Sequence, residues 1–544
     1  MRTLLSLTCL LLAMPVLGVL GAWLAFDAAA WAVLTHQFQT VLVGYALQSL
    51  LLAAFVAVGV ALLGGGAASA VALFEFPGRR IFEWALLLPM AMPAYVLAYA
   101  YTDFLQFSGP AQSALRTVTG LEGALWPDVR SLSGAVLLFV LCLYPYVYLL
   151  VRTSLAERGV QMMEAARLLG AGLWRRIGAV ALPLSRPALV AGVALALMET
   201  LADYGVGSYF GLTTFSTGIY KAWLVMNDRT AAAQLASLLL LLVALLLWAE
   251  RRARRHLRFA STRAAAHSSG NEGRAVVLQG RLAWLAWSLC AVPVVFGFLL
   301  PLVVLARLVW QEALYGDFGL PLARFAQWCL TSFQLAATAA ILAALLAMAL
   351  AFALRLSSTR ADRRLRTRVL HGAVRTVSLG YALPGAVIAV GILLPVGAVQ
   401  ALWPAAPLGT IVTGSVAGLL YAYLVRFSAV ALQSLEAGYA RLPASLDDSA
   451  RMLGASRGRL LAAVHAPLLR RSVLAAALLV FVDVMKELPA TLVLRPFNSD
   501  TLAVVAYNLA RDERLAEAAL PSLAIVVVGL LPVLLLSRAM RRDV

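Results

Sequence analysis

Residues 164–184 of this 544-residue chain read EAARLLGAGLWRRIGAVALPL, and residues 448–468 read DSARMLGASRGRLLAAVHAPL. Both stretches have Ala-Arg, two apolar residues and Gly-Ala in the same places, followed by a proline at the same distance from that glycine. One constant offset relates the matched positions, so Gly170 corresponds to Gly454 and Pro183 to Pro467. A repeat at one fixed spacing indicates that the chain contains two copies of one structural unit.

The composition places the chain in a lipid bilayer. Apolar residues make up 62% of it and charged residues only 13%, whereas a soluble protein has about 25% charged residues. These proportions exclude a disordered chain, a collagen, a disulfide-stapled secreted module and a soluble enzyme. They leave an all-α membrane protein that crosses the bilayer many times.

Twelve runs are long and apolar enough to cross a bilayer as helices, which takes about 20 residues each. Six lie in the first half of the chain and six in the second: 4–26, 43–63, 84–102, 132–151, 188–206, 231–249, 283–306, 331–354, 377–398, 410–430, 472–492 and 519–537. The first run is longer than the apolar core of a signal peptide and more runs follow it, so we expect it to be retained.

Positive charge alternates along the chain with these runs. The formal net charge is +18, and arginine clusters occupy every second segment between runs, at 79–80, 152–186, 251–263, 355–368 and 441–471, and again in the tail. Cytoplasmic loops carry such an excess, so the pattern predicts both termini in the cytoplasm. Because the basic residues form no single folded domain, we expect no nucleic-acid partner.

The spans and the repeat together predict two halves in the same orientation. We expect six helices over 1–260, a cytoplasmic linker over 261–281, and six more helices over 282–544. Prolines support this division, since Pro93 and Pro384 occupy the third span of each half and are expected to break it.

The repeated stretches lie in the first loop, 153–187, and the second loop, 434–471, which join the fourth and fifth spans of their halves. Both are too long for simple connections. In the first loop we predict a short helix over Glu164–Leu169 that ends at Gly170 in the left-handed conformation. A second amphipathic helix would then lead to Pro183. Such a projection suits docking into a groove of a soluble partner; the alternative is an amphipathic loop on the lipid headgroups.

The E-A-A-x-x-x-G pattern with its distal Leu-Pro resembles the signature of permease subunits of bacterial binding-protein-dependent ABC importers. In that family the loop fits a groove of the ATPase subunit, one loop per half. The resemblance assigns ATPase coupling to nine residues: Glu164, Ala165, Ala166, Gly170, Pro183, Asp448, Ala450, Gly454 and Pro467. The second copy departs from the pattern, with Asp-Ser-Ala in place of Glu-Ala-Ala, so the two dockings need not be equally strong.

Longer strings narrow the resemblance within the family. Residues 76–106, 198–236 and 483–523 are similar to the fused permeases of ferric-iron importers, and fused thiamine permeases are the alternative. The resemblance covers essentially the whole chain. It implies the type I importer permease fold, the bacterial inner membrane, two copies of a cytoplasmic ATPase subunit and a periplasmic substrate-binding protein. It implies no cofactor in this chain, because ATP binds to the ATPase subunits.

Four acidic residues lie inside the predicted spans. Glu199 and Asp203 are four residues apart, which places them on one helix face, and Asp483 and Glu487 repeat that spacing. Charged groups within a bilayer normally face the protein interior or a water-filled path. We therefore predict that these acids line a translocation pathway. The alternative is structural, with Asp483 paired to Lys486 and with Asp203 and Glu487 acting as caps at the outer interface.

The sequence contains no recognisable catalytic or metal site. A phosphate-binding G-x-x-x-x-G-K-[ST] loop needs lysine after glycine, but Tyr220 precedes Lys221 and Met485 precedes Lys486. The four cysteines occur singly, with no metal-ligand spacing. We therefore expect a transport subunit without its own ATPase site. The rival hypothesis is a secondary transporter of the major-facilitator type, which also has two parallel halves but needs no docking loops.

Overall fold

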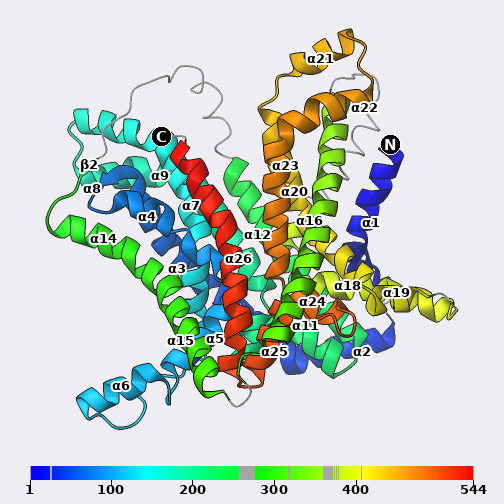
Figure 1. Ribbon diagram of the computed structural model, residues 1–544, viewed down its shortest axis with the longest axis horizontal. Helices are drawn as coiled ribbons and strands as arrows, with labels where there is room; N and C mark the ends of the chain where they lie inside the picture. Colours follow the sequence, from blue (N-terminus) through cyan, green and yellow to red (C-terminus); the bar gives the residue numbers. More distant parts are fainter. Residues whose placement is uncertain are drawn as a thin grey trace. The chain divides into compact units, whose positions relative to one another are not determined.

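The computed structural model describes residues 2–24, 27–255, 276–316, 319–358, 372, 374, 377, 379–405 and 407–542. Over these residues the chain is almost entirely helical (Figure 1). The strands described there form one short parallel pair, β1 (Phe74–Glu75) with β2 (Val276–Val277). The prediction of an all-α protein is confirmed, while most of the predicted linker, 261–281, falls outside the described residues.

The chain forms two compact units, and each takes segments from both sequence halves. Unit 1 consists of residues 1–37, 219–237 and 321–505, and unit 2 of residues 38–218, 238–320 and 506–544. The predicted halves therefore describe the repeat in the sequence, whereas the units describe how the helices pack.

A close helix crossing holds the N-terminal helix in unit 1. There α1 (Arg2–Gly21) packs on α18 (Gly385–Leu402). A Cβ atom on Gly18 would clash with the carbonyl oxygen of Gly391, and a Cβ on Gly391 would clash with that of Pro15. Small residues let helix backbones approach closely in a membrane, where packing drives association. The two glycines therefore explain why α1 packs against a helix of the second half.

The core of unit 2 consists of three long helices, α3 (Val43–Leu73), α7 (Leu132–Leu168) and α9 (Leu182–Ala202). Glycines again permit the contacts, since a Cβ on Gly64 would lie 2.6 Å from the carbonyl oxygen of Tyr144. The other elements of unit 2, besides β1 and β2, are η1 (Phe38–Leu42), α4 (Arg79–Ala85), η2 (Leu88–Ala91), α5 (Ala94–Leu105), α6 (Pro110–Thr119), α8 (Leu173–Arg176), η3 (Ile177–Ala181), α10 (Gly205–Tyr209), α14 (Arg281–Val294), η5 (Val295–Leu299), α15 (Leu300–Tyr315) and α26 (Leu515–Arg542).

The core of unit 1 has the same design, with α16 (Leu322–Ser358), α20 (Val416–Ala440) and α23 (Ala466–Met485) packed on one another. Its other elements are α2 (Ala28–Gln37), η4 (Lys221–Val225), η6 (Gly380–Ala382), α19 (Leu408–Gly414), α21 (Ala444–Met452), α22 (Arg457–Arg459), η7 (Leu460–His465) and α24 (Pro489–Leu494). Three helices contribute residues to both units: α11 (Phe215–Tyr220), α12 (Arg229–Arg255) and α25 (Leu502–Arg511).

Hydrogen bonds at matching positions confirm that the two cores are copies. Ser131 caps α7, and Ser415, its counterpart at the offset that relates Gly170 to Gly454, caps α20; each accepts a hydrogen bond from a backbone N–H of the first turn. Ser49 on α3 and Ser332 on α16 each accept a hydrogen bond from the first N–H of a later helix, α11 or α25. The repeat seen in the sequence is thus a repeat of structure.

Nine helices in the described part of the chain are long and apolar enough to cross a membrane, and a bent pair makes a tenth candidate. That pair, Arg79–Ala91 and Ala94–Thr119, is bent by 91° next to Pro93, so the predicted break of the third span is confirmed. The first and eleventh predicted spans end earlier than expected. The helix α1 ends at Gly21 instead of reaching 26, and α23 ends at Met485 instead of reaching 492.

Within each unit, one chain terminus lies at the end that carries a long loop. In Figure 1 the start of α1 lies at the same end of unit 1 as α21 and α22 of the second loop. The end of α26 lies at the same end of unit 2 as α8 of the first loop. This arrangement agrees with termini that share a membrane side with the two loops.

Candidate functional site

The first loop and the second loop build their tips in different ways. In the first loop, α7 continues unbroken to Leu168, so the prediction of a separate short helix over Glu164–Leu169 is wrong. In the second loop, α20 ends and a separate helix, α21, begins after Pro443. Proline removes one helical hydrogen bond and disfavours helical backbone in the residue before it, so a helix often ends there. The first loop has Gly159 at the corresponding position, and its helix continues.

Both tips end in the same glycine cap. The φ angle of Gly170 is 82° and that of Gly454 is 80°. In the first cap, the N–H of Gly170 donates to the carbonyl of Arg167 at 2.9 Å, and the N–H of Ala171 donates to that of Ala166 at 3.0 Å. The second cap has the same two bonds at the same lengths. This pair of bonds is the Schellman motif, and the predicted helix end at Gly170 is confirmed.

Each cap leaves two large apolar side chains in solvent. Leu168 is 84% exposed and Leu169 is 87% exposed. Met452 and Leu453, at the corresponding positions of the second loop, are 89% and 88% exposed. Adjacent apolar side chains on a projecting tip are typical of a surface that a protein partner covers. The tips are therefore the candidate docking sites.

The remaining motif residues surround these apolar pairs. The exposed ones are Glu164, Ala165 and Asp448, and the half-buried ones are Ala166 and Ala450. Asp448 pairs with Arg451 at 3.2 Å on the same helix face. Ala450 packs against a buried apolar cluster formed by Phe352, Leu356 and Leu460. Each motif thus presents an acid to solvent and turns a small residue inward.

Each loop joins its next span through a π-helical turn. In the first loop, α8, η3 and α9 follow one another without a gap, and in the second, α22, η7 and α23 do so. Pro183 and Pro467 lie in the first two positions of α9 and α23. Because proline has no N–H and crowds the preceding turn, a wider turn before it relieves the conflict. Four residues outside any helix, 169–172 in the first loop and 453–456 in the second, connect each tip to this helical run, so a displaced tip is joined to its span by a short link.

A buried polar network lies beneath the second tip, and sequence analysis missed it. Asp447 is fully buried, and its carboxylate accepts a hydrogen bond from Nε of Arg355 at 2.9 Å. Its other oxygen lies 3.0 Å from Nε2 of His465, whose Nδ1 lies 3.2 Å from the hydroxyl of Tyr439. Arg355 also donates to two backbone carbonyls just beyond α20, at 3.1 and 2.9 Å. No local pattern around position 447 distinguishes this buried acid from its exposed neighbour.

The network keeps Asp447 ionised. Burial is the largest single influence and raises the pKa of Asp447, but the hydrogen bonds and charges of Arg355 and His465 outweigh it and lower the pKa below its ordinary value. A carboxylate with a lowered pKa contributes stability above its unfolded pKa of about 3.9 and loses it as the pH falls through the folded value. At neutral pH this contribution is fully present.

The predicted pathway acids lie around the ends of α9 and α23. Asp203 and Glu487 come after these helices have ended, so the prediction that each acidic pair shares one helix face is wrong. Oδ1 of Asp203 accepts a hydrogen bond from the N–H of Val206 at 2.8 Å. Glu487 accepts hydrogen bonds from two N–H groups in the first turn of α24, at 2.9 and 3.0 Å. Each carboxylate thus caps the short helix that follows, α10 or α24.

The structure contains the contacts expected if these acids have a structural role. Nη1 of Arg426 lies 3.2 Å from the carboxylate of Glu487, and both side chains are buried. Nζ of Lys486 lies 2.9 Å from the carboxylate of Asp483. Glu199 is half-buried near the end of α9. The role of these four acids in a pathway stays a prediction.

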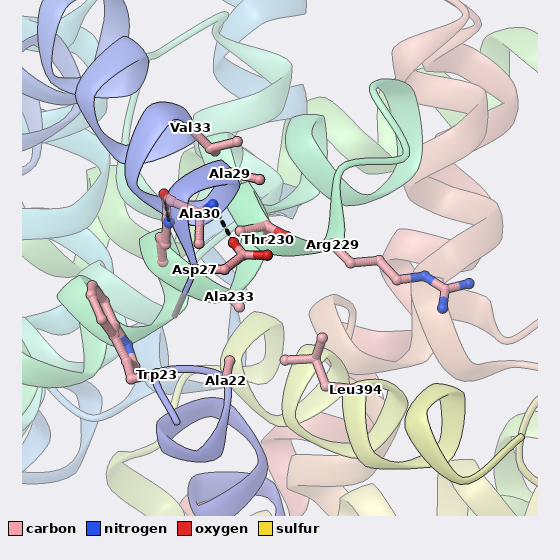
Figure 2. A pocket seen from close by; sticks show the side chains of 11 residues that line it. Ala22, Trp23, Asp27, Ala29, Ala30, Val33, Arg229, Thr230, Ala233 and Leu394 are labelled. Atoms are coloured by element: carbon pink, nitrogen blue, oxygen red, sulfur yellow. Dashed lines mark hydrogen bonds between the residues drawn. The ribbon is translucent and has the colours of Figure 1, made fainter. Parts of the chain in front are cut away.

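Unit 1 also contains a cavity of about 310 Å³, shown in Figure 2. Its charged lining residues are Asp27 and Arg229. The carboxylate of Asp27 accepts a hydrogen bond from the N–H of Ala30 at 2.8 Å, and Figure 2 shows Arg229 pointing away from Asp27. None of the predicted site residues lines this cavity. Among the residues described, no three His, Cys, Asp or Glu side chains are grouped so that they could hold a metal ion.

The first half of the chain matches a known protein family. Residues 61–259 match the family described as the binding-protein-dependent transport system inner membrane component. This range contains the first loop with its motif, its glycine cap and the span that follows it.

Three relatives differ in how much of the chain they cover. The Fe(3+)-transport system permease protein FbpB 2 of Haemophilus influenzae is 23% identical over 90% of this chain and 89% of its own length. The molybdenum transport system permease protein ModB of Escherichia coli is 29% identical over 32% of this chain and 76% of its own. PhnU of Salmonella typhimurium, assigned to a 2-aminoethylphosphonate transport system, is 27% identical over 36% of this chain and 69% of its own.

Replacing Gly170 or Gly454 by alanine is expected to loosen the corresponding tip. A Cβ atom at either position would have no neighbour within 4 Å, so the cost comes from the positive φ alone, about 1–2 kcal/mol for a residue with a Cβ. We expect faster protease cleavage within the altered loop of the purified protein. Gly172→Ala is the matched control, because Gly172 has equal space but no positive φ. Equal cleavage rates for G170A and G172A would contradict this account.

Replacing Glu487 by glutamine is expected to destabilise unit 1. Removing one partner of a buried ion pair costs about 3–5 kcal/mol, because the other charge stays buried. Asp483→Asn is the matched control, since its pair with Lys486 is partly exposed and is worth about 0–1 kcal/mol. The midpoint of thermal unfolding in detergent measures both effects. Similar midpoints for the two variants would show that the buried pair does not support the fold.

Proposed function

We propose that this chain, a membrane permease of the binding-protein-dependent ABC importer family with the type I permease fold in two fused halves, carries ferric iron across the bacterial inner membrane. The energy would come from a separate ATPase that docks on the two loop tips. The observation that supports this coupling best is that each loop ends in a glycine-capped helix exposing two large apolar side chains.

The tips have the properties of a docking surface. Burying one exposed leucine or methionine side chain stabilises a complex by about 1.5–3 kcal/mol, and each tip offers two such side chains next to an exposed acid. The acid, Glu164 or Asp448, can orient a partner by its charge. Two tips of the same local structure favour two copies of one ATPase subunit. The partner is needed because the chain has no phosphate-binding lysine loop.

The charge distribution supports one orientation in the membrane. Arginine-rich segments include both long loops and the C-terminal tail, and such segments remain in the cytoplasm. We infer that both termini and both tips lie in the cytoplasm, where the ATPase is located. The opposite ends of the helices would then face the periplasm and receive the substrate-binding protein.

The proposed mechanism uses the short link between each tip and the helical run that continues into its span. When the ATPase subunits close on ATP, they would displace the tips, and α9 and α23 would move with them because only four residues separate each tip from the helical run that contains α9 or α23. The ends of these helices, at Ala202 and Met485, are next to the predicted pathway acids. Two conformations a few kcal/mol apart are sufficient, provided that ATP and the loaded binding protein bind one of them more tightly.

Alignment coverage favours ferric iron as the cargo. FbpB 2, the iron permease, aligns with both halves of this chain, whereas ModB and PhnU each cover only about a third of it. A fused two-half permease therefore has a full-length counterpart among iron importers. A fused thiamine permease remains the alternative from the sequence. The major-facilitator hypothesis has no support from these relatives, each of which is described as a permease protein of a transport system.

Replacing both apolar residues of a tip by aspartate is expected to release the ATPase. The double variants are L168D/L169D and M452D/L453D, and each places two charges where apolar contact is proposed. We expect at least a tenfold loss of ATPase co-purification. A tenfold change in affinity corresponds to about 1.4 kcal/mol of binding free energy, and the free energy of the lost apolar burial exceeds this. Val118→Asp is the control, since Val118 is also 84% exposed but lies on α6 outside the loops. Full retention of the ATPase by both double variants would exclude docking at the tips.

The cargo can be determined by uptake into a strain that lacks the chromosomal copy of this permease. We expect the chain, expressed with its ATPase and binding protein, to restore uptake of radiolabelled ferric iron and not of thiamine, molybdate or 2-aminoethylphosphonate. Restored uptake of one of the other three solutes, with no iron uptake, would reassign the cargo and leave the coupling mechanism intact.

A further inference from the structure

The buried network beneath the second tip is not repeated at the corresponding described positions of the first half. Its members lie on four elements, with Arg355 on α16, Tyr439 on α20, Asp447 on α21 and His465 on η7. The corresponding residues of the first half are all apolar and buried: Ala72, Leu155, Met163 and Ala181 are 5%, 0%, 3% and 3% exposed. The same four positions are filled by apolar side chains in one half and by a charged network in the other.

Structural landmarks establish which positions correspond. The loops and their flanking helices repeat at the offset that relates Gly170 to Gly454, as the glycine caps and the serine caps of α7 and α20 show. The helix before them repeats at an offset shorter by one position, because Ser49 and Ser332 make equivalent hydrogen bonds. This second offset pairs Ala72 with Arg355, since both follow the serine landmark of their helix at the same distance along the chain.

The second tip needs an anchor that the first does not need. The first tip is the end of α7, a helix of 37 residues, and moves as part of it. The second tip is α21, a helix of nine residues that Pro443 separates from α20. A helix of that length has little stability by itself and holds its place through tertiary contacts. Hydrogen bonds fix both the distance and the direction of such a contact.

The side chain of Asp447 joins α21 by hydrogen bonds to two other elements. Arg355 reaches it from the end of α16, and His465 reaches it from the turn that leads directly into α23. The bond from His465 therefore joins the tip to the span that ends near Glu487. A force on Met452 and Leu453 reaches α16 and α23 through this carboxylate as well as along the chain.

We propose that Asp447 is a positioning residue for transport, which transmits the movement of the second tip to α16 and α23, while the first tip achieves the same through apolar packing and helix continuity. The inference rests on the proposed coupling function of the tips. It predicts that the network is required for converting ATP hydrolysis into transport and is dispensable for ATPase binding, which uses the exposed Met452 and Leu453.

The test compares ATP hydrolysis with transport in the assembled complex. The chain is reconstituted into lipid vesicles with its ATPase subunits, and the binding protein supplies radiolabelled ferric iron. We expect Asp447→Asn to retain the ATPase and to lower the iron moved per ATP hydrolysed by about fivefold or more, the usual range for loss of coupling between sites. Met163→Leu is the matched control at the corresponding apolar position, and it should leave this ratio unchanged.

A rescue variant separates positioning from the particular chemistry of the network. The four-residue variant R355A/Y439L/D447M/H465A copies the apolar set of the first half. Replacing a whole buried ionic network by apolar residues is often tolerated, whereas removing one member is not. We expect this variant to recover most of the coupling that Asp447→Asn loses. Failure of a folded, ATPase-bound four-residue variant to recover coupling would contradict the inference.

Two further outcomes would overturn the proposal. In the first, Asp447→Asn has the same transport per ATP as the unaltered chain. In the second, it lowers hydrolysis and transport by one common factor, as a loss of folded complex would. If the proposed function itself were wrong, the unaltered chain would not retain the ATPase. The role assigned to Asp447 would then be wrong as well.

Discussion

A bilayer core offers no water to a backbone N–H or C=O group, so every interruption of a helix inside the membrane needs a partner from the protein itself. In this chain the acids after α9 and α23 supply that partner. Asp203 and Glu487 accept hydrogen bonds from the first N–H groups of α10 and α24. The buried carboxylate of Glu487 in turn requires a cation, and Arg426 provides it. Both of these carboxylates thus lie where a helix stops and the next one begins.

The two halves share their helix packing and differ in their polar interiors. Cys142 occupies the position that corresponds to Arg426, and apolar residues occupy those that correspond to the network around Asp447. Both copies have the three-helix core and the glycine-capped tip. Where Pro443 interrupts the second copy, a buried ionic network holds the separated helix, because continuity of the helix no longer does so.

The two packing units do not coincide with the two halves of the sequence repeat, and this affects how a movement of one tip acts on the molecule. The first helix of the chain belongs to unit 1, and α14 and α15, the first helices of the second half, belong to unit 2. Each unit therefore contains segments from both halves. A movement applied to one tip acts on a body to which both halves contribute, even though each tip is connected along the chain to the helices of its own half.

Local sequence was sufficient to predict the membrane class, the repeat, the break at Pro93 and the glycine end of the first tip, because each depends on local composition or on the backbone preference of single residues. Three features became apparent only in the folded chain: α7 extends through the first tip, Asp447 is buried beside an exposed Asp448, and Glu487 is paired with Arg426. The ion pairs Arg426–Glu487 and Arg355–Asp447 join residues 61 and 92 positions apart. Hydrophobic periodicity reports which face of a helix is apolar, but it carries no information about which distant side chain will meet that face.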